Sequence, residues 1–305
     1  MSEAQPVADA SGAAAPPTLE ERVAGQLEAI VNKRLENNQL VLPALPAVAV
    51  KCLALIKDAD FSLRDAAALI EKDPILAAQL VRLASSAAMG AREPMKSVFA
   101  SVSRIGAQKL RTFLIEASSR KVFESRDARI AEALKGLWDH SRVVALMARD
   151  VVAFSNSGDP EMGYLAGLLH DIGKPVVAAL LLETERSLQD TRKNAVWLSG
   201  AQFVGVLQRC HQKVGLAMAS RWEMPDPVQR AIRDCTEYDN ADRLSIANCV
   251  RFANAVAKQN GVYVGPMVKD DVEALVMIGK SLLNIDDEVI TRLGRSVAGM
   301  LKESA

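Results

Sequence analysis

The sequence predicts an all-α protein, and three observations carry this expectation. Half of the 305 residues are apolar but only 4% are aromatic, so Ala, Leu and Val supply most of the core-forming side chains. That mixture favours helices over a β-sandwich or barrel. No segment of strand length alternates apolar and polar residues with a period of two. The dipeptide Asp-Pro, an N-cap followed by a proline suited to the first helical position, occurs at residues 73–74, 159–160 and 226–227.

The first part of the chain divides into a tail and a series of short helices. Residues 1–17 are rich in Ala, Ser and Pro, which predicts a flexible tail. Thr18 and Ser62 each stand three residues before an acidic residue, the spacing of a capping box. Together with the apolar spacing, these signals predict helices over 18–37, 62–71, 74–87, 97–104 and 107–124. A further helix is predicted after the prolines at 43 and 46 and ends at residue 57.

Helical spacing continues through the second part of the chain. The predicted helices cover 137–154, 160–172, 202–222, 227–236, 243–258, 270–283 and 286–303. The helix over 160–172 is expected to stop at Gly173, because Pro175 follows it. We therefore expect a flexible tail over 1–17, an N-terminal helical lobe over 18–125, a second helical lobe over 126–260 and C-terminal helices over 261–305.

Charge and hydropathy bound the classes of function. Lys plus Arg and Asp plus Glu each number 37, so no whole-chain basic field favours nucleic acid or anionic lipid. The most basic stretch, Lys109–Lys121, is interpreted as a solvated helix face. The longest apolar stretches, such as 40–50 and 175–182, fall short of the roughly 18 residues of a membrane span. With no visible secretory signal and no CxxC pair, we expect a cytoplasmic protein without a membrane segment.

The three histidines are the most informative residues. His140 and His211 each lie on an apolar stripe of a predicted helix, and His170 ends an apolar run just before Asp171. One interpretation is three separate core histidines, each hydrogen-bonded. The other is that the imidazoles and Asp171 meet at a divalent transition metal, which would activate water for attack on a phosphoester. Because neighbouring side chains project about 100° apart on a helix, sharing one metal requires a helix end or bend.

Several motifs carry a resemblance to a known family. The segment Leu165–Lys174, LAGLLHDIGK, resembles the signature of the HD superfamily of metal-dependent phosphohydrolases. The closer resemblance is to the HD-related output domain, HDOD, a module of bacterial signalling proteins. It covers about residues 35–260, and the further matching segments occur in the expected order: 42–46, 73–87, 97–111, His140-Ser141 and His211 through Gly215. The resemblance implies a multi-helix HD-like domain with an N-terminal helical lobe, in which HDOD begins near residue 35.

The same resemblance implies a degenerate metal site. His140, His170 and Asp171 match the first three ligands of a catalytic HD site, but Asn254 stands where the late aspartate is expected. An amide oxygen brings no negative charge, so metal affinity should fall, and Asn254→Asp should strengthen it. Segment 234–237 also lacks two family histidines. At most one iron, manganese, zinc or nickel ion is implied. In an active site, Lys174 would neutralise substrate phosphate and His211 would orient water or a ligand.

The sequence thus leads to two functional hypotheses. The first is a non-catalytic regulatory module of signal transduction, without a cofactor, that binds a signalling protein or a small ligand. The alternative is a metal-dependent phosphohydrolase that acts on a nucleotide or another phosphoester at a one-metal site. A nucleic-acid partner is disfavoured by the zero net charge.

Overall fold

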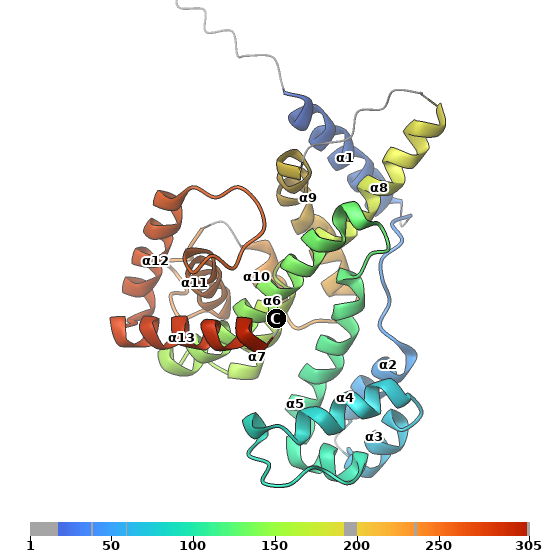
Figure 1. Ribbon diagram of the computed structural model, residues 1–305, viewed down its shortest axis with the longest axis vertical. Coiled ribbons are helices and arrows are strands. Elements are labelled where there is room, and N and C mark those ends of the chain that lie inside the picture. Colours follow the sequence, from blue (N-terminus) through green and yellow to red (C-terminus); the bar gives the residue numbers. More distant parts are fainter. Residues whose placement is uncertain (1–17, 38, 59, 192–199, 235–236, 304–305) are drawn as a thin grey trace, which may run out of the picture.

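The prediction of an all-α fold is confirmed. The computed structural model describes residues 18–303 except 38, 59, 192–199 and 235–236, so the predicted tail over 1–17 lies outside the described residues. The described elements are helices, joined by turns and loops (Figure 1). They are α1 (Leu19–Glu36), α2 (Ala47–Ile56), α3 (Leu63–Ile70), α4 (Pro74–Ala84), α5 (Val98–Arg120), α6 (Ala128–Ser155), α7 (Pro160–Leu169), α8 (Gly173–Thr191), α9 (Gly200–Arg221), α10 (Asp226–Arg233), α11 (Ile246–Gln259), α12 (Lys269–Leu283) and α13 (Asp287–Glu303).

The helices α2 to α4 pack with α5 around a first apolar core. This core is small and is built from residues such as Ile70, Leu80 and Leu110. Predicted caps start its helices: the Asp73 carboxylate accepts hydrogen bonds from the backbone N–H groups of residues 75 and 76. Gly106 has a φ of +74°, which kinks α5 where two helices, 97–104 and 107–124, are predicted. In Figure 1, α5 leads from this group toward the middle of the molecule.

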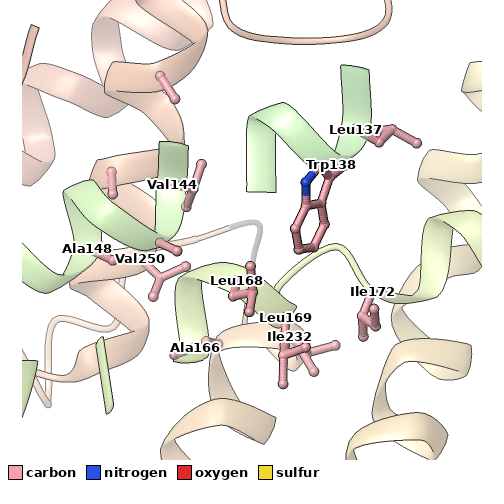
Figure 2. Close-up of a cluster of buried hydrophobic side chains, with 14 of the residues drawn as sticks. Leu137, Trp138, Val144, Ala148, Ala166, Leu168, Leu169, Ile172, Ile232 and Val250 are labelled. Carbon is pink, nitrogen blue, oxygen red and sulfur yellow. The ribbon is translucent and has the colours of Figure 1, made fainter. Parts of the chain in front are cut away.

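A larger second core joins α1 with the helices from α6 onward. Figure 2 shows part of it, where apolar side chains of α6, α7, α10 and α11 converge, Trp138 and Leu168 among them. Val31 of α1 belongs to this core, and α1 packs against α9. The C-terminal helices α12 and α13 both pack against α11. The burial of apolar area in this core is the main force that holds the functional side chains in place.

Several boundaries differ from those that the sequence predicts, and helix α8 lies where no helix is predicted. Helix α6 begins at Ala128 rather than 137, because Asp127 caps it through a hydrogen bond from the Arg129 N–H. The helix predicted to stop at Gly173 ends instead at Leu169, and Gly173 starts α8. Pro175 lies in the first turn of α8, where a missing N–H costs nothing. Residues 170–172 are therefore a tight turn between two helices.

One stretch of the chain, Pro160–Thr184, is long and apolar enough by composition to cross a membrane. Its most apolar window is 94% buried inside the protein, as in a core helix. The turn at 170–172 also interrupts it, since α7 ends before this turn and α8 begins after it.

Candidate metal centre

Two close helix crossings bring the histidines together. At the crossing of α7 and α6, a Cβ atom on Gly167 would lie 2.8 Å from the Cα of Ala145. At the crossing of α8 and α9, a Cβ on Gly173 would lie 1.9 Å from the carbonyl oxygen of His211. Gly215, one turn after His211, faces Gly173 across this contact. Only glycine permits such backbone approach, so these positions fix where His140, His170 and His211 lie.

Asp171 is the centre of the site. Its Oδ2 atom lies 3.3 Å from Nε2 of His170 and 3.9 Å from Nε2 of His140. Its Oδ1 atom lies 3.4 Å from Nε2 of His211. The Lys174 ammonium donates a hydrogen bond of 2.6 Å to Oδ2. The bend between α7 and α8 allows the adjacent His170 and Asp171 to share this position.

Each imidazole is oriented by the backbone. Nδ1 of His140 lies 2.7 Å from the carbonyl oxygen of Val262, and Nδ1 of His170 lies 2.7 Å from that of Gly167. Nδ1 of His211 lies 2.8 Å from the carbonyl oxygen of Gln208. A carbonyl accepts only, so Nδ1 carries the hydrogen in all three rings. Nε2 of a neutral ring then presents a lone pair toward Asp171, the orientation that metal-ligating histidines adopt.

The cluster is buried, and burial sets its protonation. The exposed fraction is 0% for His140, 4% for Asp171 and 6% for Lys174. Burial lowers the pKa of His140 to about 3 and also lowers the pKa of His211, so both rings are neutral at pH 7. Burial alone would raise the pKa of Asp171, but its interactions with His170 and Lys174 hold that pKa well below its usual range. The Asp171 carboxylate therefore faces the neutral imidazoles of His140 and His211 and the Lys174 ammonium.

The donor set fits a divalent transition metal in part. Ligand atoms of His140, His170 and Asp171 all lie within 4.8 Å of one another. The Nε2 atoms of His140 and His170 are buried and make no hydrogen bond within the described part of the chain. Two imidazole nitrogens and a carboxylate are suitable ligands for zinc, iron, manganese or nickel. The Lys174 ammonium, however, already contacts the carboxylate oxygen that such an ion would use.

Asn254 stands apart from the contacts that define the cluster. It lies on α11, which packs against α6 and α7, and its Oδ1 atom is buried without a hydrogen-bond partner in the described residues. None of the contacts described above that join the histidines, Asp171 and Lys174 includes it. In segment 234–237, which lacks the family histidines, residues 235 and 236 lie outside the described residues.

Tyr263 completes the site and is the residue that the sequence does not indicate. Its ring lies 5.5 Å from that of His140 between centroids, and the Lys174 ammonium lies 5.7 Å from the Tyr263 centroid. Gln208 on α9 contacts the tyrosine hydroxyl. The sequence shows only that Tyr263 follows the helix that carries Asn254. It does not show that the loop with Tyr263 folds back over His140.

Comparison with known protein families identifies the family of this chain. The family model of the HDOD domain matches residues 42–238, more than half of the chain. This chain belongs to the HDOD family. The resemblance seen in the sequence is thereby confirmed, and the HDOD match includes His140, His170, Asp171 and His211.

Solved structures share the fold of this HDOD protein. A Shewanella amazonensis SB2B protein, provisionally described as a metal-dependent phosphohydrolase, superposes with a TM-score of 0.71 at 19% identity, over 90% of this chain and 97% of that one. An HDOD domain protein of unknown function from Geobacter sulfurreducens gives a TM-score of 0.60 at 20% identity, over 90% and 97% of the two chains. At these identities the likeness shows the HD-like helical fold and nothing of the chemistry.

One curated relative is similar in sequence. An uncharacterized protein of Treponema pallidum (strain Nichols) is 27% identical to this chain over 223 residues. The match covers 70% of this HDOD chain but only 41% of that protein, so the chain spans about two fifths of its relative's length.

Proposed function

We propose that this HDOD protein is a non-catalytic regulatory module of signal transduction, which acts by binding a protein partner or a small ligand. The observation that carries the proposal is the closed, charge-matched state of the cluster. Asp171 and Lys174 are 4% and 6% exposed and hydrogen-bonded to each other at 2.6 Å. A phosphoester substrate would need access to this carboxylate, and the burial of the cluster denies it. This burial supports the interpretation of the cluster as a structural centre that joins α6, α7, α8 and α9.

A separate cleft supports the binding of a small ligand. It has a volume of about 680 Å³ and lies between α1, the segment over 39–46, the end of α5 and α8. This volume is in the range of small-molecule sites. Arg34 and Glu183 line it and form an ion pair with an N–O distance of 3.3 Å. Pro175 and Val176 also line it, so a ligand there would touch the first turn of α8, the turn that carries Lys174.

The second candidate function is a metal-dependent phosphohydrolase, favoured by the grouping of His140, His170 and Asp171. These three residues would hold the ion, which would supply an activated water for attack on a phosphoester. His211 would orient water or a ligand through Nε2, which faces Asp171 at 3.4 Å. Lys174 would have to leave Asp171 to reach a substrate phosphate.

The variant His170→Ala separates the two candidates. It removes a buried ring and its hydrogen bond to Gly167, so we expect the free energy of unfolding to fall by about 2 kcal/mol or more. The measurements are thermal melts and the hydrolysis of bis(p-nitrophenyl) phosphate and nucleotides with added Mn²⁺, Fe²⁺ or Ni²⁺. We expect no metal-dependent hydrolysis by the wild type or the variant. Unchanged melting together with abolished hydrolysis would refute the regulatory proposal and support the enzyme.

A further inference from the structure

The Lys174 ammonium lies at the point where the candidate metal ligands converge. The Asp171 Oδ2 atom that accepts its hydrogen bond also faces Nε2 of His170 and His140, at 3.3 and 3.9 Å. An ion bound by these three residues would have to contact the same oxygen. The lysine side chain is 7% exposed, so its ammonium is held inside the protein rather than in solvent.

The charges of the cluster leave no room for both cations. Asp171 is the carboxylate that the ion pairs and hydrogen bonds of this cluster share, and one ammonium already neutralises it. A divalent ion added beside Lys174 would leave two uncompensated positive charges in a buried site. Uncompensated buried charge is strongly unfavourable, so these contacts favour one cation at Asp171 over two.

The loop after α11 holds the ammonium in this place. The Tyr263 ring faces the Lys174 ammonium at 5.7 Å, close enough for a cation–π interaction. The neighbouring Val262 carbonyl accepts the hydrogen bond from His140, which fixes the loop over the cluster. A second ammonium, that of Lys258 on α11, lies 4.7 Å from the centroid of the same ring. It provides a matched comparison, because none of the ion pairs of Asp171 described above involves it.

We propose that Lys174 is a built-in cation that takes the place of the divalent metal, so that Lys174 rather than Asn254 keeps this HDOD site free of metal. The inference rests on the proposed non-catalytic function and adds the reason for it at the level of one residue. If so, His140, His170 and Asp171 remain a complete set of three metal ligands, and the Lys174 ammonium takes the position that a metal ion would need for hydrolysis.

The test is the variant Lys174→Met, whose unbranched side chain is one atom shorter and carries no charge. Untagged protein is dialysed against ZnCl2 or MnCl2 and then against metal-free buffer, and the bound metal is measured by mass spectrometry. We expect about one ion per chain in Lys174→Met, as in other sites with three protein ligands, and far less than one in the wild type. The bound ion should also raise the melting temperature of the variant and leave that of the wild type unchanged.

Three control variants make the result specific. Lys258→Met removes the other ammonium at Tyr263 and should gain no metal. Asn254→Asp adds a carboxylate while Lys174 remains, and it too should gain little. Adding His140→Ala to Lys174→Met should abolish the gained binding. The inference is overturned if the wild type binds one ion per chain, or if Asn254→Asp alone binds as much metal as Lys174→Met.

A double-mutant cycle covers the case in which Lys174→Met folds poorly. Lys174→Met and Asp171→Asn each leave a buried polar partner without its counter-charge, so each should lower the melting temperature. The melting temperature of the double variant should be higher than the sum of the two single losses predicts. Additive losses would overturn the inference. Metal bound by the wild type without hydrolysis would refute only this inference, whereas metal-dependent hydrolysis by the wild type would refute the proposed function as well.

Discussion

Gly173→Ala is expected to destabilise the protein by more than about 3 kcal/mol or to prevent folding. The added methyl group would lie 1.9 Å from the His211 carbonyl oxygen and 2.7 Å from the Gly215 nitrogen. Both are backbone atoms of α9, so no change of rotamer can relieve the clash. Helices α8 and α9 would have to move apart, and His211 would move away from Asp171. Urea denaturation followed by circular dichroism measures the loss.

The matched control for this prediction is Gly25→Ala. Gly25 lies inside α1, is exposed, and an added Cβ atom would meet nothing within 4 Å. Because alanine is the better helix former, this variant should be stabilised by about 0.5–1 kcal/mol. Equal effects of the two substitutions would show that the α8–α9 contact is not as close as described.

Asp171→Asn is expected to lower the free energy of unfolding by about 3–5 kcal/mol. The substitution keeps the size of the side chain but leaves the Lys174 ammonium buried without its counter-charge. Thermal and urea denaturation at pH 7 measure the effect, and no phosphoester substrate is needed to observe it.

Asp287→Asn is the control for the removal of an aspartate charge from an ion pair. Asp287 pairs with Lys280 at 2.5 Å, but its side chain is 86% exposed. Exposed pairs contribute less than about 1 kcal/mol, so this variant should unfold almost as the wild type does. A loss at Asp171 no larger than that at Asp287 would mean that burial of the cluster does not determine its energetics.

Much of the fold follows from local signals in the sequence. Asp73, Ser62 and Thr18 start helices where their spacing predicts, because each side chain accepts a backbone hydrogen bond at the helix start. The start of α8 could not be predicted in this way. Gly173 and Pro175 are typical of a helix end, but the close contact with α9 requires the glycine, and proline is tolerated in a first turn. Tertiary contact thus reverses a local signal.

The site was predictable in its residue types but not in its state. The apolar spacing around His140 and His211 predicts inward side chains, and the resemblance predicts that they meet His170 and Asp171. The ion pair of Lys174 with Asp171 is local, three residues apart, but the spacing alone does not show that the ammonium stays on this carboxylate. No local signal shows that the loop at Val262 accepts a hydrogen bond from His140. The second contact joins α6 to the loop after α11 and depends on how these two helices pack.

The metal content of the wild-type protein shows whether Lys174 holds the place of a metal ion in this HDOD protein. The protein should be untagged, purified without chelator, and analysed by mass spectrometry for iron, manganese, zinc and nickel. We expect far less than one ion per folded chain, with no uptake when metal is added, because Lys174 already neutralises Asp171. A near-stoichiometric content of any of these metals in the folded wild type would contradict it.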